Sequence, residues 1–196
     1  MERLLVEEDM DLIGFYSGGY AAPLTGFEWA KSVVVFGLGV EEEELLVGVR
    51  QKGWSRARQF VDQILDLAAC RVANLLLRNG YLSEVVSSSC GRADLRALAL
   101  LCGLGSPGKN GLVITPAHGP RVRFAAVATD AVLPGYGGNS TELCSGCDAC
   151  VRACPAGAIG ESFDAQRCLE YSLRSERRGK RCTLCTDVCP AGVGEP

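Results

Sequence analysis

The chain has 196 residues, with 20 Lys and Arg against 23 Asp and Glu, and a formal net charge of −3. This balance argues against a nucleic-acid binder that works by neutralising phosphates. Apolar residues make up 47% and charged residues 22% of the sequence, which excludes wholesale disorder. No apolar run is long enough to span a membrane, and the acidic N-terminus lacks the basic and apolar regions of a signal peptide. We therefore expect a cytoplasmic protein with no membrane span.

The first half of the chain predicts strands that alternate with helices. Residues 31–40 form an apolar run rich in β-branched side chains, which predicts a buried strand. The acidic residues 41–44 that follow predict a solvated loop or a first helical turn. Residues 55–79 have a helical period, in which one face collects the apolar side chains Phe60, Ile64, Leu67, Val72, Leu75 and Leu76.

The elements that follow complete a layer of strands and helices. Residues 93–102 predict a second helix that is closed by Gly103. Residues 111–115 and 122–129 predict strands on either side of a turn rich in Pro and Gly. Strands that alternate with helices in this way indicate the α/β class.

The loop at residues 103–110 (GLGSPGKN) matches two nucleotide-binding patterns on paper. Gly103, Gly105 and Gly108 fit GxGxxG, but that pattern needs a strand before it and a helix after it, and here the order is reversed. The loop also begins like a phosphate-binding P-loop, but Asn110 stands where a Ser or Thr would hold magnesium. We interpret the loop as a glycine-rich turn that ends a helix.

Cysteine is the residue type that sets this sequence apart, because eight of the eleven cysteines lie in the last third of the chain. Without a secretion signal, and with an odd total, such a patch predicts metal binding rather than a disulfide framework. The bacterial ferredoxin pattern for 4Fe–4S clusters is matched by Cys144-x2-Cys147-x2-Cys150-x3-Cys154-Pro155. In that pattern three thiols in a tight loop serve one cluster, and the fourth cysteine serves the other cluster.

The second half of the pattern is shorter, and it runs Cys182-x2-Cys185-x3-Cys189-Pro190, with Cys168 upstream making up the number. By the crossover seen in two-cluster ferredoxins, we assign one 4Fe–4S cluster to Cys144, Cys147, Cys150 and Cys189. The other 4Fe–4S cluster takes Cys168, Cys182, Cys185 and Cys154. Zinc is the competing interpretation, since Cys-x2-Cys pairs also hold zinc, but zinc ribbons seldom contain a three-cysteine run that ends in Cys-Pro.

A Gly-rich connector at residues 134–140 separates the aliphatic part of the chain from the cysteine-rich part. We therefore predict two domains. The first is an α/β domain over residues 1–138, and the second is a ferredoxin-like domain with both clusters over residues 139–196.

The remaining candidate residues have weaker patterns. Cys70 and Cys102 lie within and at the end of predicted helices, where buried packing is the expected role. Cys90 lies in a polar loop that could approach a site, and the lone His118 is interpreted as a surface turn residue. A basic cluster before the second cysteine set predicts a solvated loop or, alternatively, a docking patch for an acidic redox partner or a local field that raises the potential of the nearby cluster. The cluster consists of Arg174, Arg177, Arg178, Lys180 and Arg181.

The cysteine block resembles the iron–sulfur domain of epoxyqueuosine reductases and, more distantly, of corrinoid-dependent reductive dehalogenases. Residues 167–171 (RCLEY) and the shortened second cysteine set separate it from plain ferredoxins. The resemblance extends upstream through residues in the order that the family shows, namely Arg96, Leu98-Ala99, Gly103-Leu104-Gly105, Gly108-Lys109-Asn110, residues 112–115, Gly119, Thr129-Asp130 and Leu133.

The resemblance implies a fold and a second cofactor. That family carries a cobalamin-type corrinoid on a nitroreductase-like α/β layer, which in this chain is reduced in size, and its clusters feed electrons to cobalt. By resemblance, a corrinoid (cobamide) pocket would be lined by Ser89, Gly105, Gly108 and Lys109. Reductases of the family place a catalytic acid where this chain has Ser89, and a serine does not donate a proton as a carboxylic acid does. No catalytic residue is therefore assigned, and epoxide reduction on transfer RNA is not expected.

Three functions follow from these patterns. The first is electron transfer through two 4Fe–4S clusters to a redox partner protein or a bound cofactor, which needs no residue beyond the cysteines. The alternative is a corrinoid-dependent reductase or a corrinoid-reducing protein related to epoxyqueuosine reductase. The third is a regulatory or structural cluster protein without electron flow.

Overall fold

Segments far apart in the chain come together in two compact units. The computed structural model describes residues 10–18, 26–40, 54–87, 93–135, 142–176 and 182–192. The first unit comprises Met1–Gly39, Phe60–Leu104 and Val122–Ser140, and the second comprises Val40–Gln59, Gly105–Arg121 and Thr141–Pro196. The second unit thus takes a middle segment of the chain, Gly105–Arg121, in addition to the cysteine-rich end. The domain border at residues 138 and 139 stays a prediction.

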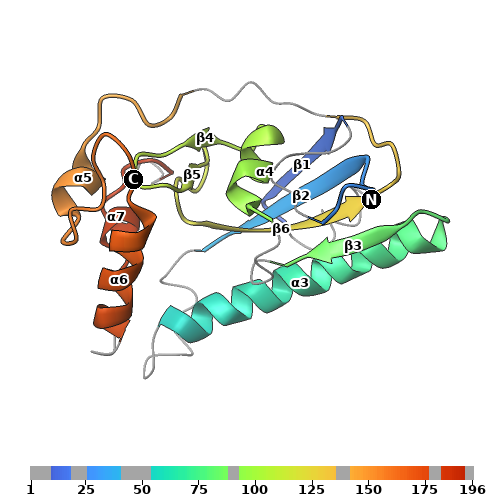
Figure 1. The fold of residues 1–196 in the computed structure, drawn as a ribbon, viewed down its shortest axis with the longest axis horizontal. Coiled ribbons are helices and arrows are strands. Elements are labelled where there is room, and N and C mark those ends of the chain that lie inside the picture. The colour runs from blue at the N-terminus through green and yellow to red at the C-terminus, as the bar shows by residue number, and fades with distance from the viewer. Residues whose placement is uncertain are drawn as a thin grey trace. The chain divides into compact units, whose positions relative to one another are not determined.

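The first unit contains a four-stranded antiparallel sheet in the order β1-β2-β6-β3 (Figure 1). The predicted strands at 31–40 and 122–129 are confirmed as β2 and β6, and they pair with Val34 opposite Val127. The sequence does not predict the two flanking strands, which are shorter and only partly buried. The bounds of the four strands are β1 (Leu12–Ser17), β2 (Ser32–Gly39), β3 (Ser83–Val86) and β6 (Val122–Thr129).

The core of the first unit lies around the two central strands. From Val33 to Phe36 in β2 and from Ala125 to Ala128 in β6, no residue is more than 1% exposed. A strand buried on both faces needs a layer on each side. Helix α4 (Leu95–Leu101) packs on β1, β2 and β6, and α3 (Trp54–Arg78) runs along the other side of the sheet (Figure 1).

Helix α3 confirms the helix predicted at residues 55–79, but the predicted apolar face is partly wrong. Phe60, Leu67 and Leu75 are 57%, 54% and 36% exposed. The buried face includes three alanines, whose small side chains let the helix approach its neighbours closely, and it consists of Val61, Leu65, Ala68, Ala69, Val72, Ala73 and Leu76. A pattern built on large apolar residues misses such a face.

The second helix of this unit confirms the helix predicted at residues 93–102 in shortened form, as α4 (Leu95–Leu101). The Asp94 carboxylate accepts hydrogen bonds from the backbone N–H groups of Arg96 and Ala97, which caps the N-terminus of α4. Gly103 has a φ of 68° directly after the C-cap Cys102, a left-handed conformation that favours glycine. The interpretation of the loop as a helix-ending turn is therefore confirmed at its first residue.

The described part of the second unit includes a small ribbon and the helices α5, α6 and α7 (Figure 1). The strand predicted at 111–115 is confirmed in shortened form as β5, which pairs with β4 in a separate ribbon and not in the main sheet. Helices α5 and α7 pack against each other. The bounds are β4 (Ser106–Pro107), β5 (Val113–Ile114), α5 (Ala149–Ala153), α6 (Ala165–Glu176) and α7 (Leu184–Asp187).

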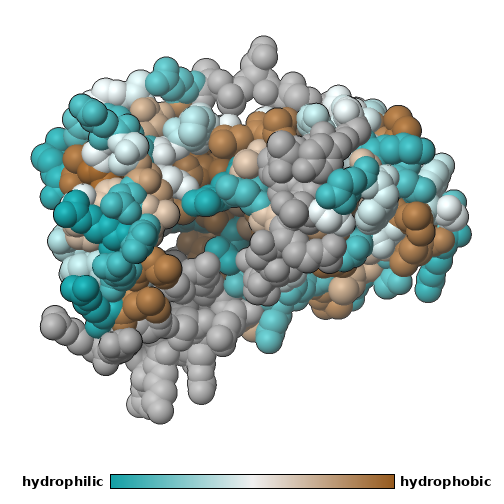
Figure 2. All heavy atoms as spheres, in the orientation of Figure 1, coloured by the Kyte–Doolittle hydropathy of each residue, from teal (hydrophilic) through white to brown (hydrophobic). Residues whose placement is uncertain are grey.

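The surface of the described residues mixes hydrophilic and hydrophobic side chains. On the face that Figure 2 shows, hydrophobic side chains lie in small groups between hydrophilic ones. Large apolar side chains are exposed on several elements, among them Leu67 of α3, Leu82 before β3, and Leu169 of α6. Within the described part of the chain, no helix combines the length and the apolar character needed to cross a membrane.

Candidate metal centres

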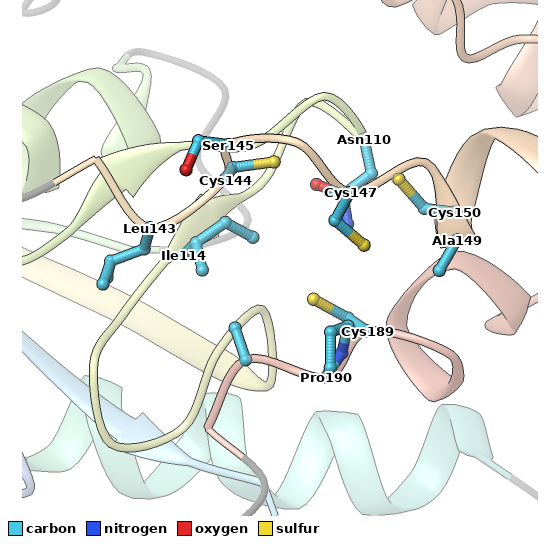
Figure 3. Close-up of a pocket in the computed structure, with 11 residues that line it drawn as sticks. Asn110, Ile114, Leu143, Cys144, Ser145, Cys147, Ala149, Cys150, Cys189 and Pro190 are labelled. Atoms are coloured by element: carbon cyan, nitrogen blue, oxygen red, sulfur yellow. The ribbon is translucent and has the colours of Figure 1, made fainter.

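Four cysteines from two segments of the chain surround one cavity of about 290 Å³ in the second unit (Figure 3). Cys144 and Cys147 lie in the loop before α5, and Cys150 lies on α5 itself. Cys189 comes from the turn that follows α7. Figure 3 shows the four sulfur atoms facing the same open space. These are the four cysteines that the crossover pattern assigns to one cluster.

The remaining walls of this cavity come from the ribbon and from the Cys-Pro turn. Asn110 and Ile114 belong to the segment between α4 and β6, and both side chains are buried, at 3% and 2% exposed. Pro190 and Ala191 close the side next to Cys189. Among the described residues, no three His, Cys, Asp or Glu side chains lie close enough together to hold a single metal ion.

Three cysteines of the second predicted set also influence one another. Burial raises the pKa of the Cys185 thiol to about 11, and the neighbouring charges of Cys168 and Cys182 act in the same direction. Cys168 lies on α6, whereas Cys182 and Cys185 lie just before and within α7. Cys154, the fourth member of the set, directly follows α5 as its C-cap residue.

Backbone N–H groups of the described residues point at sulfur atoms of both predicted sets. The amide of Lys109 donates to Cys144 Sγ over 3.5 Å, and the amide of Ala158 donates to Cys154 Sγ over 3.3 Å. Such donors stabilise negative charge on sulfur, and hydrogen bonds to sulfur raise the reduction potential of an iron–sulfur cluster. One amide therefore serves a cysteine of each predicted set.

An ion pair lies next to the first cysteine set. Lys109 Nζ and Asp148 Oδ1 are 2.6 Å apart, and both side chains are more than a third exposed. The hydrogen bond to Asp148 raises the pKa of Lys109, and the same contact lowers the pKa of Asp148. The charges of Cys144 and Cys150 also raise the pKa of Lys109, so its ammonium acts on this set of sulfur atoms.

Hydrogen bonds anchor the loops that carry the cysteines. The backbone N–H of Leu143 donates over 3.0 Å to Ser106 Oγ, a buried hydroxyl at the start of β4. At the other end of the site, Thr183 Oγ1 donates over 2.9 Å to the Asp187 carboxylate, which ties the two ends of α7 together. Sequence patterns single out none of these four residues, because their partners are set by tertiary contacts.

Three of the four residues predicted to line a corrinoid pocket lie in the second unit. A Cβ at Gly105 would meet the carbonyl of Ile114, and a Cβ at Gly108 would lie 2.6 Å from Oδ1 of Asn110. Packing of the ribbon is therefore a sufficient reason for glycine at both positions. Lys109 contributes to the cysteine site as described above. Ser89 lies outside the described residues, and the corrinoid pocket stays a prediction.

The other candidate residues divide into three groups. Cys102 is 3% exposed, and burial raises the pKa of its thiol to about 12, which confirms its packing role. The prediction of a buried Cys70 is wrong, because this residue is exposed on α3. His118 lies in the turn between β5 and β6, as expected. Arg174 lies 3.8 Å from Glu170, and the rest of the basic cluster lies outside the described residues, as does Cys90.

Comparison with protein families supports the cysteine pattern directly. Residues 140–160 match a 4Fe–4S binding domain, and residues 178–192 match a second 4Fe–4S binding domain. The two matches contain seven of the eight cysteines, with Cys168 lying between them. The chain therefore carries two 4Fe–4S binding motifs.

Two kinds of curated protein are similar to this chain. An epoxyqueuosine reductase from a Synechococcus species is 35% identical over 107 residues, which is 48% of this chain and 33% of that protein. The tetrachloroethene reductive dehalogenase of Dehalobacter restrictus is 33% identical over 138 residues, 68% of this chain and 24% of that protein. The chain thus spans a third or less of the length of these relatives.

Solved structures of both kinds share the fold. A reductive dehalogenase, whose structure was used to suggest a mechanism for B12-dependent dehalogenation, superposes with a TM-score of 0.77 at 20% identity and covers 98% of this chain and 31% of its own. An epoxyqueuosine reductase in complex with an epoxyqueuosine-modified tRNA-Tyr stem loop gives a TM-score of 0.72 at 21% identity, over 98% of this chain and 65% of its own. The mixed α/β fold with ferredoxin-like motifs at its C-terminal end, and the resemblance to both kinds of protein, are therefore confirmed.

Proposed function

We propose that this chain is an iron–sulfur redox protein that transfers electrons through two 4Fe–4S clusters to a partner protein or a bound cofactor. The observation that carries the proposal is the meeting of Cys144, Cys147, Cys150 and Cys189 around one cavity. Four thiols without a nitrogen or oxygen ligand are the donor set that such clusters use. The two 4Fe–4S binding motifs add support from outside the structure.

We assign the eight cysteines to two clusters by the crossover that the sequence predicts. Cys144, Cys147, Cys150 and Cys189 would hold the first cluster, and the second would be held by Cys154, Cys168, Cys182 and Cys185. When bound, each cluster supplies a carrier for one electron at a time. Because Cys150 and Cys154 belong to the two ends of one short helix, α5 would connect the two ligand sets through the backbone.

Backbone amides of this chain would stabilise negative charge on the sulfur atoms. The amides of Lys109 and Ala158 donate to Cys144 and Cys154, so each ligand set receives a hydrogen bond when its thiols are ionised. Burial raises the pKa of Cys150 and of Cys185, so both prefer the neutral thiol until a cation replaces the proton. These groups are arranged to favour the metal-bound form over the bare thiolate.

A variant set tests this proposal with a control from the same chain. In electron paramagnetic resonance of the reduced protein, Cys189→Ser should alter one cluster signal, and Cys168→Ser should alter the other. Cys70→Ser should alter neither signal, because this cysteine is exposed on α3 and belongs to neither set. A single signal in the unaltered protein, or the loss of both signals from Cys70→Ser, would refute the two-cluster assignment.

The second candidate function is a corrinoid-dependent reductase or a corrinoid-reducing protein. A specific observation favours it: over 98% of its length, this chain shares its fold with a reductive dehalogenase whose structure suggested a mechanism for B12-dependent dehalogenation. Hydroxocobalamin added to the cluster-loaded protein should then stay bound through a desalting column, and its cobalt should become reduced when the clusters are reduced. Cobalamin that elutes free at micromolar protein would leave electron transfer to a partner as the function.

The proposal also covers the cellular compartment of the protein and the kind of partner that it binds. A dense cysteine set with cluster-ligand spacing supports a reducing compartment such as the cytoplasm. The net charge of −3 supports a protein partner over a nucleic acid. One structural neighbour was solved with a tRNA stem loop, so a gel-shift titration with transfer RNA is the direct check. Retention of RNA at physiological salt would overturn this part.

A further inference from the structure

The side chain of Arg121 contacts the segment that surrounds Cys189. Its Nη1 donates to the carbonyl oxygens of Thr186 and Cys189, each over 3.3 Å. Its Nη2 donates over 2.6 Å to the carbonyl oxygen of Ala191. One half-buried guanidinium therefore contacts the backbone before, at and after the cysteine that reaches the first cavity from the end of the chain.

Local chemistry leaves room for the guanidinium at these carbonyls. The Thr186 carbonyl already accepts the backbone N–H of Cys189 over 3.2 Å, so Arg121 adds a second donor to an oxygen that has two lone pairs. Pro190 follows Cys189 and has no N–H to close a hydrogen-bonded turn. A planar guanidinium offers five N–H groups in a fixed fork, whereas a lysine ammonium is a compact point charge on a flexible stem.

The same two segments also approach each other closely at a second place. A Cβ at Gly119 would meet the carbonyl oxygen of Ala191, and a Cβ at Gly192 would meet the backbone of His118 and Gly119. The backbones of the two turns thus lie directly against each other. The turn that carries Arg121 is itself closed by paired backbone hydrogen bonds of 2.9 Å between Thr115 and Gly119.

We propose that Arg121 is a positioning residue for Cys189. Its fork fixes the backbone on both sides of the cysteine, so that the sulfur stays at the cavity it shares with Cys144, Cys147 and Cys150. This inference rests on the proposed function, because it assumes that Cys189 is a cluster ligand. It assigns a role to a residue that contacts no sulfur atom and lies far from the cysteines in the sequence.

The test compares Arg121→Lys and Arg121→Gln with Arg152→Gln. Arg152 is an exposed cation on α5, between two cysteines of the pattern, and so controls for a general loss of positive charge. Iron release to a chelator is followed under anaerobic conditions, with the two cluster signals assigned by Cys189→Ser and Cys168→Ser. Hydrogen–deuterium exchange of the peptide covering residues 184–192 is measured on the same samples without added chelator.

Both Arg121 variants should release iron from the first cluster about tenfold faster, because charge-assisted hydrogen bonds to the turn are lost. The second cluster should be unaffected, exchange in residues 184–192 should rise, and Arg152→Gln should behave as the unaltered protein. Wild-type release and exchange in Arg121→Lys would show that charge alone matters and would overturn the inference. Equal acceleration at both clusters would also overturn it, because it would indicate general unfolding.

The two proposals fail in different ways. If the unaltered protein takes up no cluster, the proposed function fails, while the exchange measurement on metal-free protein still tests whether Arg121 holds residues 184–192. If the unaltered protein holds both clusters and the Arg121 variants match it in release and exchange, the positioning role alone is refuted.

Discussion

The backbone amide of Lys109 donates a hydrogen bond to the sulfur of Cys144 over 3.5 Å, across 35 positions of sequence. This contact joins the Gly-Lys-Asn turn to the first cysteine of the ferredoxin pattern. The ammonium group of the same lysine pairs with Asp148, the residue just before α5. This turn, whose sequence resembles a nucleotide-binding loop, therefore forms one wall of the cysteine site.

Removing the charge of Lys109 should lower the reduction potential of the first cluster. Lys109→Met keeps the backbone amide and removes only the cation, so the shift should be modest, on the order of tens of millivolts at low salt. Asp148→Asn should shift the potential upwards, because it removes a negative charge beside the cluster. Lys31→Met, at an exposed lysine in the other unit, is the control. Shifts of the same sign in the Lys109 and Asp148 variants would contradict this electrostatic account.

Gly119→Ala should destabilise the second unit. Gly119 has a φ of 55°, and an added methyl group would meet the carbonyl oxygen of Ala191. Left-handed strain alone costs about 1–3 kcal/mol for a residue other than glycine. Gly160→Ala is the matched control, because a Cβ there has no neighbour within 4 Å. Denaturant unfolding measures both variants, and equal midpoints would show that the two turns are less closely packed than described.

Asp62→Ala should destabilise the first unit and leave the clusters unchanged. The Arg123 guanidinium contacts both oxygens of Asp62, at 2.8 and 3.1 Å, and the two side chains are only 23% and 21% exposed. Without the carboxylate, a half-buried cation lacks its partner, which costs about 1–3 kcal/mol. Gln63→Ala, at an exposed neighbour on α3, should change the free energy of unfolding by less than roughly 0.5 kcal/mol. A cluster signal altered by Asp62→Ala would argue against independent roles for the two units.

Cys70 and Cys102 should differ sharply in reactivity towards iodoacetamide. Burial raises the pKa of Cys102 to about 12 from an ordinary value of 9.0, so at pH 8 only about one thiol in ten thousand is ionised. The neutral thiol is favoured in the folded state. The stability that Cys102 contributes is therefore complete below pH 9 and is lost as the pH rises towards 12.

Mass spectrometry of labelled native protein checks this difference. Cys70 is exposed and should be labelled at pH 8, whereas Cys102 should be labelled only after unfolding. Above pH 9, the free energy of unfolding of Cys102→Ala should fall less steeply with pH than that of the unaltered protein. This result would support the link between the pKa of Cys102 and stability. Labelling of Cys102 in the folded protein at pH 8 would contradict its burial.

The cysteine spacing allowed the composition of the first site to be anticipated. Three cysteines at intervals of three residues must lie in one loop, and the crossover pattern then indicates a fourth from the other half. The structure brings these same four around one cavity. Strands β2 and β6 were also predictable, since long apolar runs with β-branched residues have few alternatives in a chain of this size.

Other features could not be predicted because they depend on contacts between distant segments. Arg121 and Lys109 contact residues far along the chain, and no local pattern marks such partners. The buried face of α3 was mistaken because its alanines, and not Phe60 and Leu67, pack in the core. β1 and β3 are short strands at the edges of the sheet, where propensity is a weak guide.

The central claim is that this chain holds two 4Fe–4S clusters, and metal content tests it most directly. Anaerobically prepared protein, with iron, acid-labile sulfide and zinc measured per chain, should contain about eight iron and eight sulfide. Cys70→Ser should leave the iron and sulfide content unchanged, whereas Cys189→Ser and Cys168→Ser should lower it. About two zinc per chain without sulfide, or iron near four per chain in fully loaded protein, would contradict the account.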